Sequence, residues 1–168
     1  MIRYYSGIGN RDVDMPIYWS SLIREIVELL YGKDFILRSG GAEGTDSMFE
    51  KHVGNKKEIY LPFKGFNKNV SELYFISEES KQMAIKHHPA GHNLSSTVLN
   101  FHARNCYQIL GYKLDLPVEF VICLCKDMNS GGTSQALRIA KAYDIPIYNL
   151  YDMDDKELNE FWNYLKGL

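Results

Sequence analysis

The chain has 168 residues, 45% of them hydrophobic, and its 19 basic and 21 acidic side chains give a formal net charge of -2. This length predicts a single domain over 1–168, and the apolar content is enough for a full core. A nearly neutral chain lacks the basic surface that non-specific nucleic-acid binding requires. Tight DNA binding is therefore not expected, and any anion site must be local.

The cysteines and the hydropathy pattern indicate the cellular compartment of the protein. Cys106, Cys123 and Cys125 form an odd set without CxxC spacing, which predicts reduced thiols rather than disulfides or a zinc site. No stretch approaches the length of a membrane span, and the N-terminus lacks the layout of a signal peptide. We therefore expect a cytoplasmic protein with no membrane partner, no bound metal and no cofactor.

The first half of the chain alternates predicted strands and helices. Apolar residues from Trp19 to Leu30 recur at helical spacing, and Gly32 is placed as the helix stop. Strands are expected at 2–6, 35–38 and 58–61, and helices at about 19–32 and 45–53. This βαβαβ order is the first half of a doubly wound parallel sheet.

The second half is less regular until its strongest strand. Pro89 and Gly91 break the helical pieces within 63–93, and helical character returns over 94–110. The near-continuous apolar run 118–124 predicts a strand that is covered on both faces. A helix that contains Ala136, a short strand at 145–150 and a helix at 154–165 with Asp154 or Asp155 as its cap complete the pattern.

Three predicted strand-to-helix turns, at 7–11, 39–46 and 126–133, contain glycines. Because such turns share one edge of a parallel sheet, they would form one backbone-lined crevice suited to phosphate. The structural alternative is a tight turn with no ligand, in which Thr45 or Asp46 caps the helix. The candidate ligand-binding residues in these turns are Gly7, Gly9, Asn10, Arg11, Ser39, Gly40, Gly41, Ala42, Gly44, Thr45, Asp46, Ser130, Gly131, Gly132 and Thr133.

Carboxylates and histidines are the candidates for chemistry, and the sequence assigns no catalytic residue among them. Asp46 and Glu50 share a helix face, so either is a candidate base, although Asp46 is equally suited to cap its helix. The histidines at 87, 88 and 92 straddle a proline and a glycine, which leaves no helical pair of metal ligands. A loop that covers the pocket is the favoured interpretation of that segment.

The motifs Gly9-Asn10-Arg11, 39–46, Arg104-Asn105 and 130–133 resemble those of the Rossmann-like domain of DNA-processing protein A (DprA), in the SLOG superfamily. The stretch from His102 to Gln108 is especially similar to small stand-alone phage proteins of this kind. The resemblance implies one doubly wound α/β domain, with about five parallel strands in the order 3-2-1-4-5 and helices on both faces. It also adds His102, Arg104 and Asn105 to the candidate ligand-binding residues. Arg104 would clamp a phosphate, whereas its structural alternative is a surface salt bridge.

The resemblance implies binding of a nucleotide or nucleotide-derived signal molecule, and in a phage setting the capture of a host-defence signal. The first alternative is a nucleotide N-glycoside hydrolase that uses Asp46 or Glu50. However, the superfamily's phosphoribohydrolases have a glutamate in the second glycine turn, where 131–136 contain no acid. The second alternative is DprA-like binding and processing of single-stranded DNA, for which the flanking domains and a basic cluster are missing. A homo-oligomer is expected, and whether the protein is an enzyme stays open.

Overall fold

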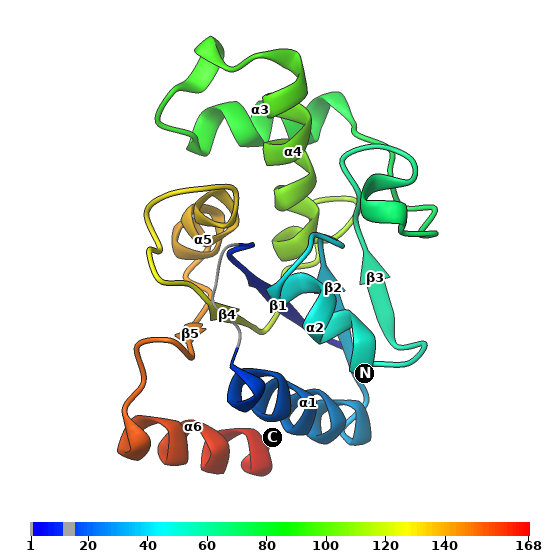
Figure 1. The fold of residues 1–168 in the computed structure, drawn as a ribbon. Helices are drawn as coiled ribbons and strands as arrows, with labels where there is room; N and C mark the ends of the chain where they lie inside the picture. The colour runs from blue at the N-terminus through cyan, green and yellow to red at the C-terminus, as the bar shows by residue number, and fades with distance from the viewer. Residues whose placement is uncertain (1, 12–15) are drawn as a thin grey trace.

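A parallel five-stranded sheet lies at the centre of the computed structural model, which describes residues 2–11 and 16–168 (Figure 1). The strand order is β3-β2-β1-β4-β5, and every neighbouring pair is parallel, which confirms the predicted fold class. The strands are β1 (Arg3–Gly9), β2 (Phe35–Ser39), β3 (Lys57–Ile59), β4 (Phe120–Leu124) and β5 (Ile147–Asn149).

Helices cover both faces of the sheet. One layer consists of α1, α2 and α6, and the other of α4 and α5 with α3 packed on the outside of α4 (Figure 1). In the described part of the chain the helices are α1 (Ile17–Gly32), α2 (Thr45–His52), α3 (Glu78–His87), α4 (Ser96–Leu110), α5 (Thr133–Ala142) and α6 (Asp155–Gly167), with short 3-10 turns at η1 (Phe66–Lys68) and η2 (Gly91–Asn93). None of these helices has both the length and the apolar character needed to cross a bilayer.

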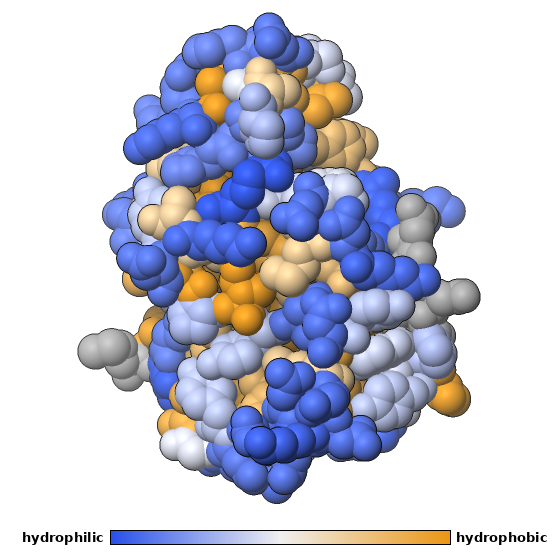
Figure 2. Space-filling model, turned by 90° about the vertical axis from the view of Figure 1, so that its left-hand side faces the viewer, coloured by the Kyte–Doolittle hydropathy of each residue, from blue (hydrophilic) through white to orange (hydrophobic). Residues whose placement is uncertain are grey.

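Strand β4 is apolar throughout because it contributes side chains to the cores on both faces of the sheet. Its side chains alternate between two cores, with Phe120 and Ile122 in the layer of α1 and α6, and Val121 and Cys123 in the layer of α4 and α5. All five residues are buried because the strand is covered on both sides. Figure 2 views the molecule from the side of α5, β5 and α6, where the surface is mostly hydrophilic and apolar residues gather near the middle.

Strand β1 is longer than predicted, so Gly7 and Gly9 lie inside it rather than in the turn that follows. They pair with Ile122 and Leu124 of β4. A Cβ on Gly7 would lie 2.5 Å from Cγ of Phe49, so this glycine allows α2 to pack directly on the strand. The backbone pairing of β1 with β4 therefore runs through both glycines.

Helix caps were predicted correctly in one place and wrongly in another. Asp154 caps α6 in a capping box with Glu157, as predicted. By contrast, neither Thr45 nor Asp46 caps α2, whose N-cap is Gly44 at φ 81° with no side-chain cap. The Asp46 carboxylate instead bonds to backbone N–H groups outside the helix.

The segment between β3 and β4 forms a helical hairpin that stands above the sheet (Figure 1). Serine side chains begin both helices, because Ser77 accepts a hydrogen bond from Ser80 N and Ser95 accepts one from Val98 N. The Tyr107 hydroxyl accepts from Ser77 N at 2.8 Å and ties α3 to α4. This hairpin places the second half of α4 beside the carboxyl ends of the strands.

Candidate functional site

A cavity of about 820 Å³ lies at the carboxyl edge of the sheet, between the end of β1, α4 and the start of α5. The predicted residues that line it are Gly9, Asn10, Arg11, Ala42, Asp46, His102, Arg104, Asn105, Ser130, Gly131, Gly132 and Thr133. The structure does not bring the remaining candidates to its wall, namely Gly7, Ser39, Gly40, Gly41, Gly44, Thr45 and Glu50. The three turns converge as predicted, but they contribute unequally.

Asp46 joins the first and second strands at this edge. One carboxylate oxygen accepts a hydrogen bond from Gly9 N at 3.2 Å, and the other accepts from Gly40 N at 3.1 Å. Thr133 of α5 adds a third connection by donating to Gly9 O at 2.8 Å. Both Asp46 oxygens are therefore engaged in holding the turns together.

Arg104 and Asn105 connect the two glycine turns across the cavity. Arg104 Nη1 donates to the carbonyls of Gly40 and Tyr60, and its Nε donates to Asn105 Oδ1 at 2.9 Å. Asn105 Nδ2 then donates to Gly132 O at 2.7 Å. Arg104 is only 5% exposed, so it is a buried connector, unlike the surface salt bridge considered from the sequence.

The first glycine turn is covered by the protein itself. A Cβ on Gly40 would lie 2.5 Å from Nη1 of Arg104, and one on Gly41 would lie 2.8 Å from Cδ2 of Leu61. Asn67 also donates to the Gly41 carbonyl at 3.1 Å. This packing covers Gly40 and Gly41, so that only Ala42 and Asp46 of this turn reach the cavity.

The second glycine turn is open. A Cβ built on Gly131 or Gly132 would meet nothing within 4 Å, and Gly131 has φ 73°. Helix α5 begins just after it, with Gly132 as N-cap and no side-chain cap. Bare backbone at an uncapped helix start is the arrangement that suits a phosphate.

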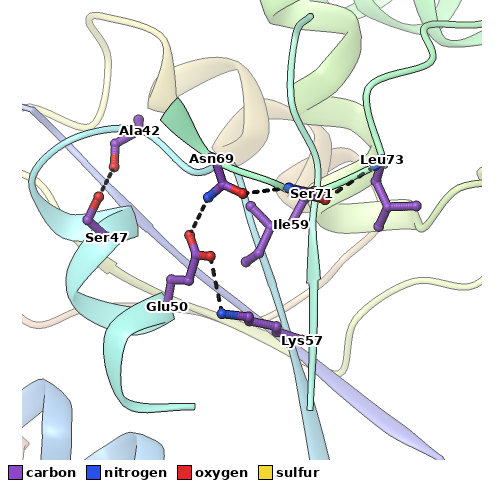
Figure 3. Close-up of polar contacts among 8 residues, drawn as sticks. All are labelled: Ala42, Ser47, Glu50, Lys57, Ile59, Asn69, Ser71 and Leu73. Carbon is purple, nitrogen blue, oxygen red and sulfur yellow. Dashed lines mark hydrogen bonds and ion pairs between the residues drawn. The ribbon is translucent and has the colours of Figure 1, made fainter. Parts of the chain in front are cut away.

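Glu50 makes a hydrogen bond and an ion pair outside the cavity (Figure 3). Its carboxylate accepts from Asn69 Nδ2 at 2.8 Å and pairs with Lys57 Nζ at 3.2 Å. Asn69 in turn accepts from Ser71 N, which fastens the loop after β3 against α2. Glu50 thus holds that loop, away from the cavity.

Charge is concentrated on the cavity wall. Arg11, Arg104, Lys126 and Arg138 line it, and no salt bridge to any of them is found among residues 2–11 and 16–168. The one acid in the described wall is Asp46, whose oxygens already accept N–H groups. A chain with a net charge of -2 therefore carries a locally positive cavity, which favours an anionic ligand.

A comparison with solved structures relates this fold to a known protein. No protein-family model matches the chain, and no curated protein matches it. The fold is similar to that of DNA processing protein A from Helicobacter pylori. That solved structure aligns with a TM-score of 0.54 at 18% identity, over 98% of this chain and 73% of the other, and its protein binds single-stranded DNA. The similarity concerns the fold, and it agrees with the resemblance seen in the motifs.

Sequence reasoning missed several residues of the wall. Arg138 donates to Ser134 Oγ at 3.1 Å and to Gln135 Oε1 at 2.8 Å, which holds its guanidinium at the cavity edge. Its position four residues after Ser134 on an N-terminal helix turn was an available signal. The other missed wall residues are Ile8, His88, Pro89, Val98, Phe101, Gln108, Lys126, Asn129 and Ser134.

The histidine segment contributes to this wall through His88 and Pro89. The His88 ring lies 4.3 Å from the His102 ring, measured between centroids. Within the described residues, no group of three or more His, Cys, Asp or Glu side chains is placed to hold a metal ion. The segment thus borders the cavity, as a covering loop would.

Burial shifts the ionisation of the groups beneath the cavity. It raises the pKa of the Asp46 carboxyl to about 6, although Arg104 and three backbone N–H groups act in the opposite direction. It lowers the pKa of Arg104 to about 10, which the Asp46 charge partly offsets. Both groups are therefore mainly ionised at neutral pH, and they face each other across the joined turns.

We expect His102 to make the fold sensitive to acid. Burial, and then the charges of His88, Arg138 and Arg104, lower the His102 pKa to about 4, from a usual value near 6.5. A depressed pKa in the folded state stabilises the protein above about pH 6.5, and that stability is lost as the pH falls towards 4. Between about pH 7 and 4.5 the loss from this group should be about 2 kcal/mol.

Urea denaturation of the wild type and of His102→Gln at a series of pH values measures this term. The glutamine variant should lose about 2 kcal/mol less free energy of unfolding over that pH range. Asp46 titrates in the same pH range, and its protonation changes the free energy of unfolding in the opposite direction. Because Asp46 is present in both proteins, its contribution cancels when the two pH curves are subtracted. Parallel pH curves for the two proteins would contradict the assignment.

Proposed function

We propose that this protein binds a nucleotide or nucleotide-derived molecule through its phosphate groups in the cavity. The observation that carries the proposal is the combination of Arg11, Lys126 and Arg138, which have no ion-pair partner among the described residues, with the open Gly131-Gly132 backbone on one wall. Guanidinium groups and free N–H groups at a helix start are the usual ligands of phosphate in proteins. Phe101 on the same wall offers a flat apolar face for a base.

The biological setting follows from the sequence resemblance and is part of the proposal. Small phage proteins with similar motifs suggest that the chain captures a nucleotide signal of host defence. Capture requires binding without turnover. The geometry favours this over hydrolysis, because both Asp46 oxygens accept backbone N–H groups and Glu50 lies outside the cavity.

Handling of single-stranded DNA is the second candidate function. The similarity in fold to DNA processing protein A favours it. The balanced charge of the whole chain argues against tight binding, since affinity for a DNA strand depends on many phosphate contacts. We expect affinity for a labelled oligonucleotide to be weaker than about 1 µM at about 0.15 M salt.

Calorimetric titration of adenosine, AMP, ADP and ATP tests the nucleotide proposal. We expect the phosphorylated compounds to bind at least about tenfold more tightly than adenosine, because a hydrogen bond to a charged group contributes about 1.5–3 kcal/mol. Lys126→Gln should weaken nucleotide binding by up to about tenfold. Lys156→Gln is the matched control, because it removes the same charge at a residue outside the cavity wall. Lys156 lies on α6 in an exposed pair with Glu160.

Equal affinities for adenosine and its phosphates would contradict a phosphate site. Equal weakening by the two lysine substitutions would show that net charge, rather than the cavity wall, controls binding. Native mass spectrometry of freshly purified protein provides a further check, because a tightly held nucleotide would appear as an added mass. Sub-micromolar binding of the oligonucleotide at about 0.15 M salt would favour the DNA candidate instead.

A further inference from the structure

Two histidine rings lie in contact on the wall of the cavity. His88 follows α3 and His102 belongs to α4, and their ring centroids are 4.3 Å apart. Both side chains line the cavity, as does Arg138 of α5. Three different elements thus place two imidazoles and one guanidinium on the same wall.

The hydrogen bonding of the two rings permits the addition of a proton. Nδ1 of His88 accepts a hydrogen bond from Ala90 N at 3.0 Å, so the neutral ring carries its proton on Nε2. His102 is 8% exposed, and its buried Nδ1 has no hydrogen-bond partner among the described residues. A proton on this Nδ1 therefore displaces no existing hydrogen bond.

The charges of the wall oppose protonation of this histidine pair. Burial, and then the charge of Arg138, lowers the pKa of His88. Burial also lowers the pKa of His102, and the charges of His88, Arg138 and Arg104 lower it further. Every charged group that shifts either pKa is therefore cationic, and Asp46, the one acid in the described wall, is not among them. The titratable groups next to His88 in the chain provide no negative charge either, namely Lys86, His87 and His92.

Arg138 acts on both rings, and its own partners do not neutralise it. The guanidinium donates to Ser134 Oγ at 3.1 Å and to Gln135 Oε1 at 2.8 Å, and both partners are neutral. Gln135 is fixed in turn, because it donates to Ala84 O of α3 at 3.0 Å. An anion that binds at Arg138 would supply the missing counter-charge, and a proton on the histidine pair would then become more favourable.

We infer that the cavity binds its anionic ligand together with a proton, which the pair of His88 and His102 takes up. This inference rests on the proposed function and names a regulation of the same site, because affinity then rises as the pH falls. The pair takes up one proton rather than two, since two imidazolium rings at 4.3 Å would repel each other. Proton and anion binding are linked, so each strengthens the other by the same factor.

Calorimetric titration with the tightest-binding of AMP, ADP and ATP tests this linkage. The proteins are the wild type, the double variant His88→Gln/His102→Gln and the matched control His52→Gln. His52 lies on α2 outside the cavity wall, and burial lowers its pKa as well. From about pH 7.5 to about pH 5.5, the affinity of the wild type and of the control should gain about fivefold relative to the double variant. Titrations at about pH 6 in two buffers of different ionisation enthalpy should show a larger proton uptake by the wild type and the control than by the double variant. The ionisation of the nucleotide is common to all three proteins and cancels in the comparison.

The imidazole resonances of the wild type provide a second measurement, which does not depend on the folding of the double variant. NMR titration with and without saturating nucleotide gives the apparent pKa values of the histidines. Binding should raise the apparent pKa of the pair of His88 and His102 by at least about one pH unit, whereas that of His52 should stay the same.

Two results would overturn the inference and leave the nucleotide function standing. Equal pH dependence and equal proton uptake in the wild type and the double variant would assign the proton to another group, such as Asp46, whose pKa is raised by burial to about 6. Unchanged pKa values of both wall histidines in the saturated protein would do the same. Failure of AMP, ADP and ATP to bind the wild type would overturn both proposals.

Discussion

Replacement of Arg104 by alanine is expected to lower the free energy of unfolding by about 3–5 kcal/mol, the range for removing one member of a buried charged network. The substitution leaves the Gly40 and Tyr60 carbonyls without this donor in a buried region. It also removes the positive charge that favours ionised Asp46. Chemical denaturation at neutral pH measures the loss. If the buried network controls stability, the denaturant concentration at the midpoint of unfolding should be lower for Arg104→Ala than for the wild type.

Arg138→Ala is the control for this experiment, because it removes an arginine from the same cavity wall. Arg138 is half-buried, and its partners Ser134 and Gln135 are neutral, so the expected loss is below about 1 kcal/mol. Similar losses in the two variants would contradict the distinction between a buried connector and an edge residue. A stable Arg104→Ala protein with weakened nucleotide binding would restore Arg104 as the phosphate clamp predicted from the sequence.

Replacement of Gly9 by alanine is expected to destabilise the protein by about 3 kcal/mol, at the upper end of the range for overpacking. The new Cβ would lie 2.5 Å from Cβ of Thr45 and 2.6 Å from the carbonyl oxygen of Leu124. The carbonyl belongs to the neighbouring strand and the threonine to a helix packed on the sheet. Moving either one would therefore disrupt strand pairing or helix packing and cost free energy. Thermal and chemical denaturation measure the effect.

Gly132→Ala separates packing from ligand contact, because it adds the same methyl group to the open turn. A Cβ there meets nothing within 4 Å, so the expected change in the free energy of unfolding is within about 0.5 kcal/mol. The methyl group would nevertheless project from a turn that lines the cavity, and nucleotide binding should weaken. Equal destabilisation by Gly9→Ala and Gly132→Ala would show that the two glycines do not differ in role.

The residue pattern was sufficient to predict the sheet. Regular helix and strand periods, with glycines at the turns, indicated alternation in the first half of the chain. The run Val118–Leu124 indicated a strand buried on both faces. Each of these signals depends on residues close together in sequence, where backbone geometry links spacing directly to the buried face. Boundaries were less certain, as the extension of β1 to Gly9 shows.

The candidate site was predictable only in outline. Parallel topology brought Asn10, Arg11 and the turn 130–133 to one cavity. The two glycine turns look alike in sequence, yet Gly41 is packed against Leu61 while Gly132 is open. The difference arises from the loop after β3 and from α4, both of which lie far from Gly41 in the chain. Local sequence therefore contains no signal that distinguishes the covered turn from the open one.

The sequence by itself determined the α/β class and the edge at which the turns meet, since these follow from short-range periodicity and from the rules of parallel sheets, and the strand order was implied by the resemblance of its motifs to a known family. The tertiary structure alone decided which polar groups form hydrogen bonds within the protein and which remain available to a ligand. Asp46 and Arg104 became connectors because their partners are backbone atoms of distant strands, whereas Arg138 stayed available because its partners are neutral. Burial and hydrogen-bond pairing depend on contacts across the whole chain, and these contacts exist only once the sheet and both helical layers have assembled.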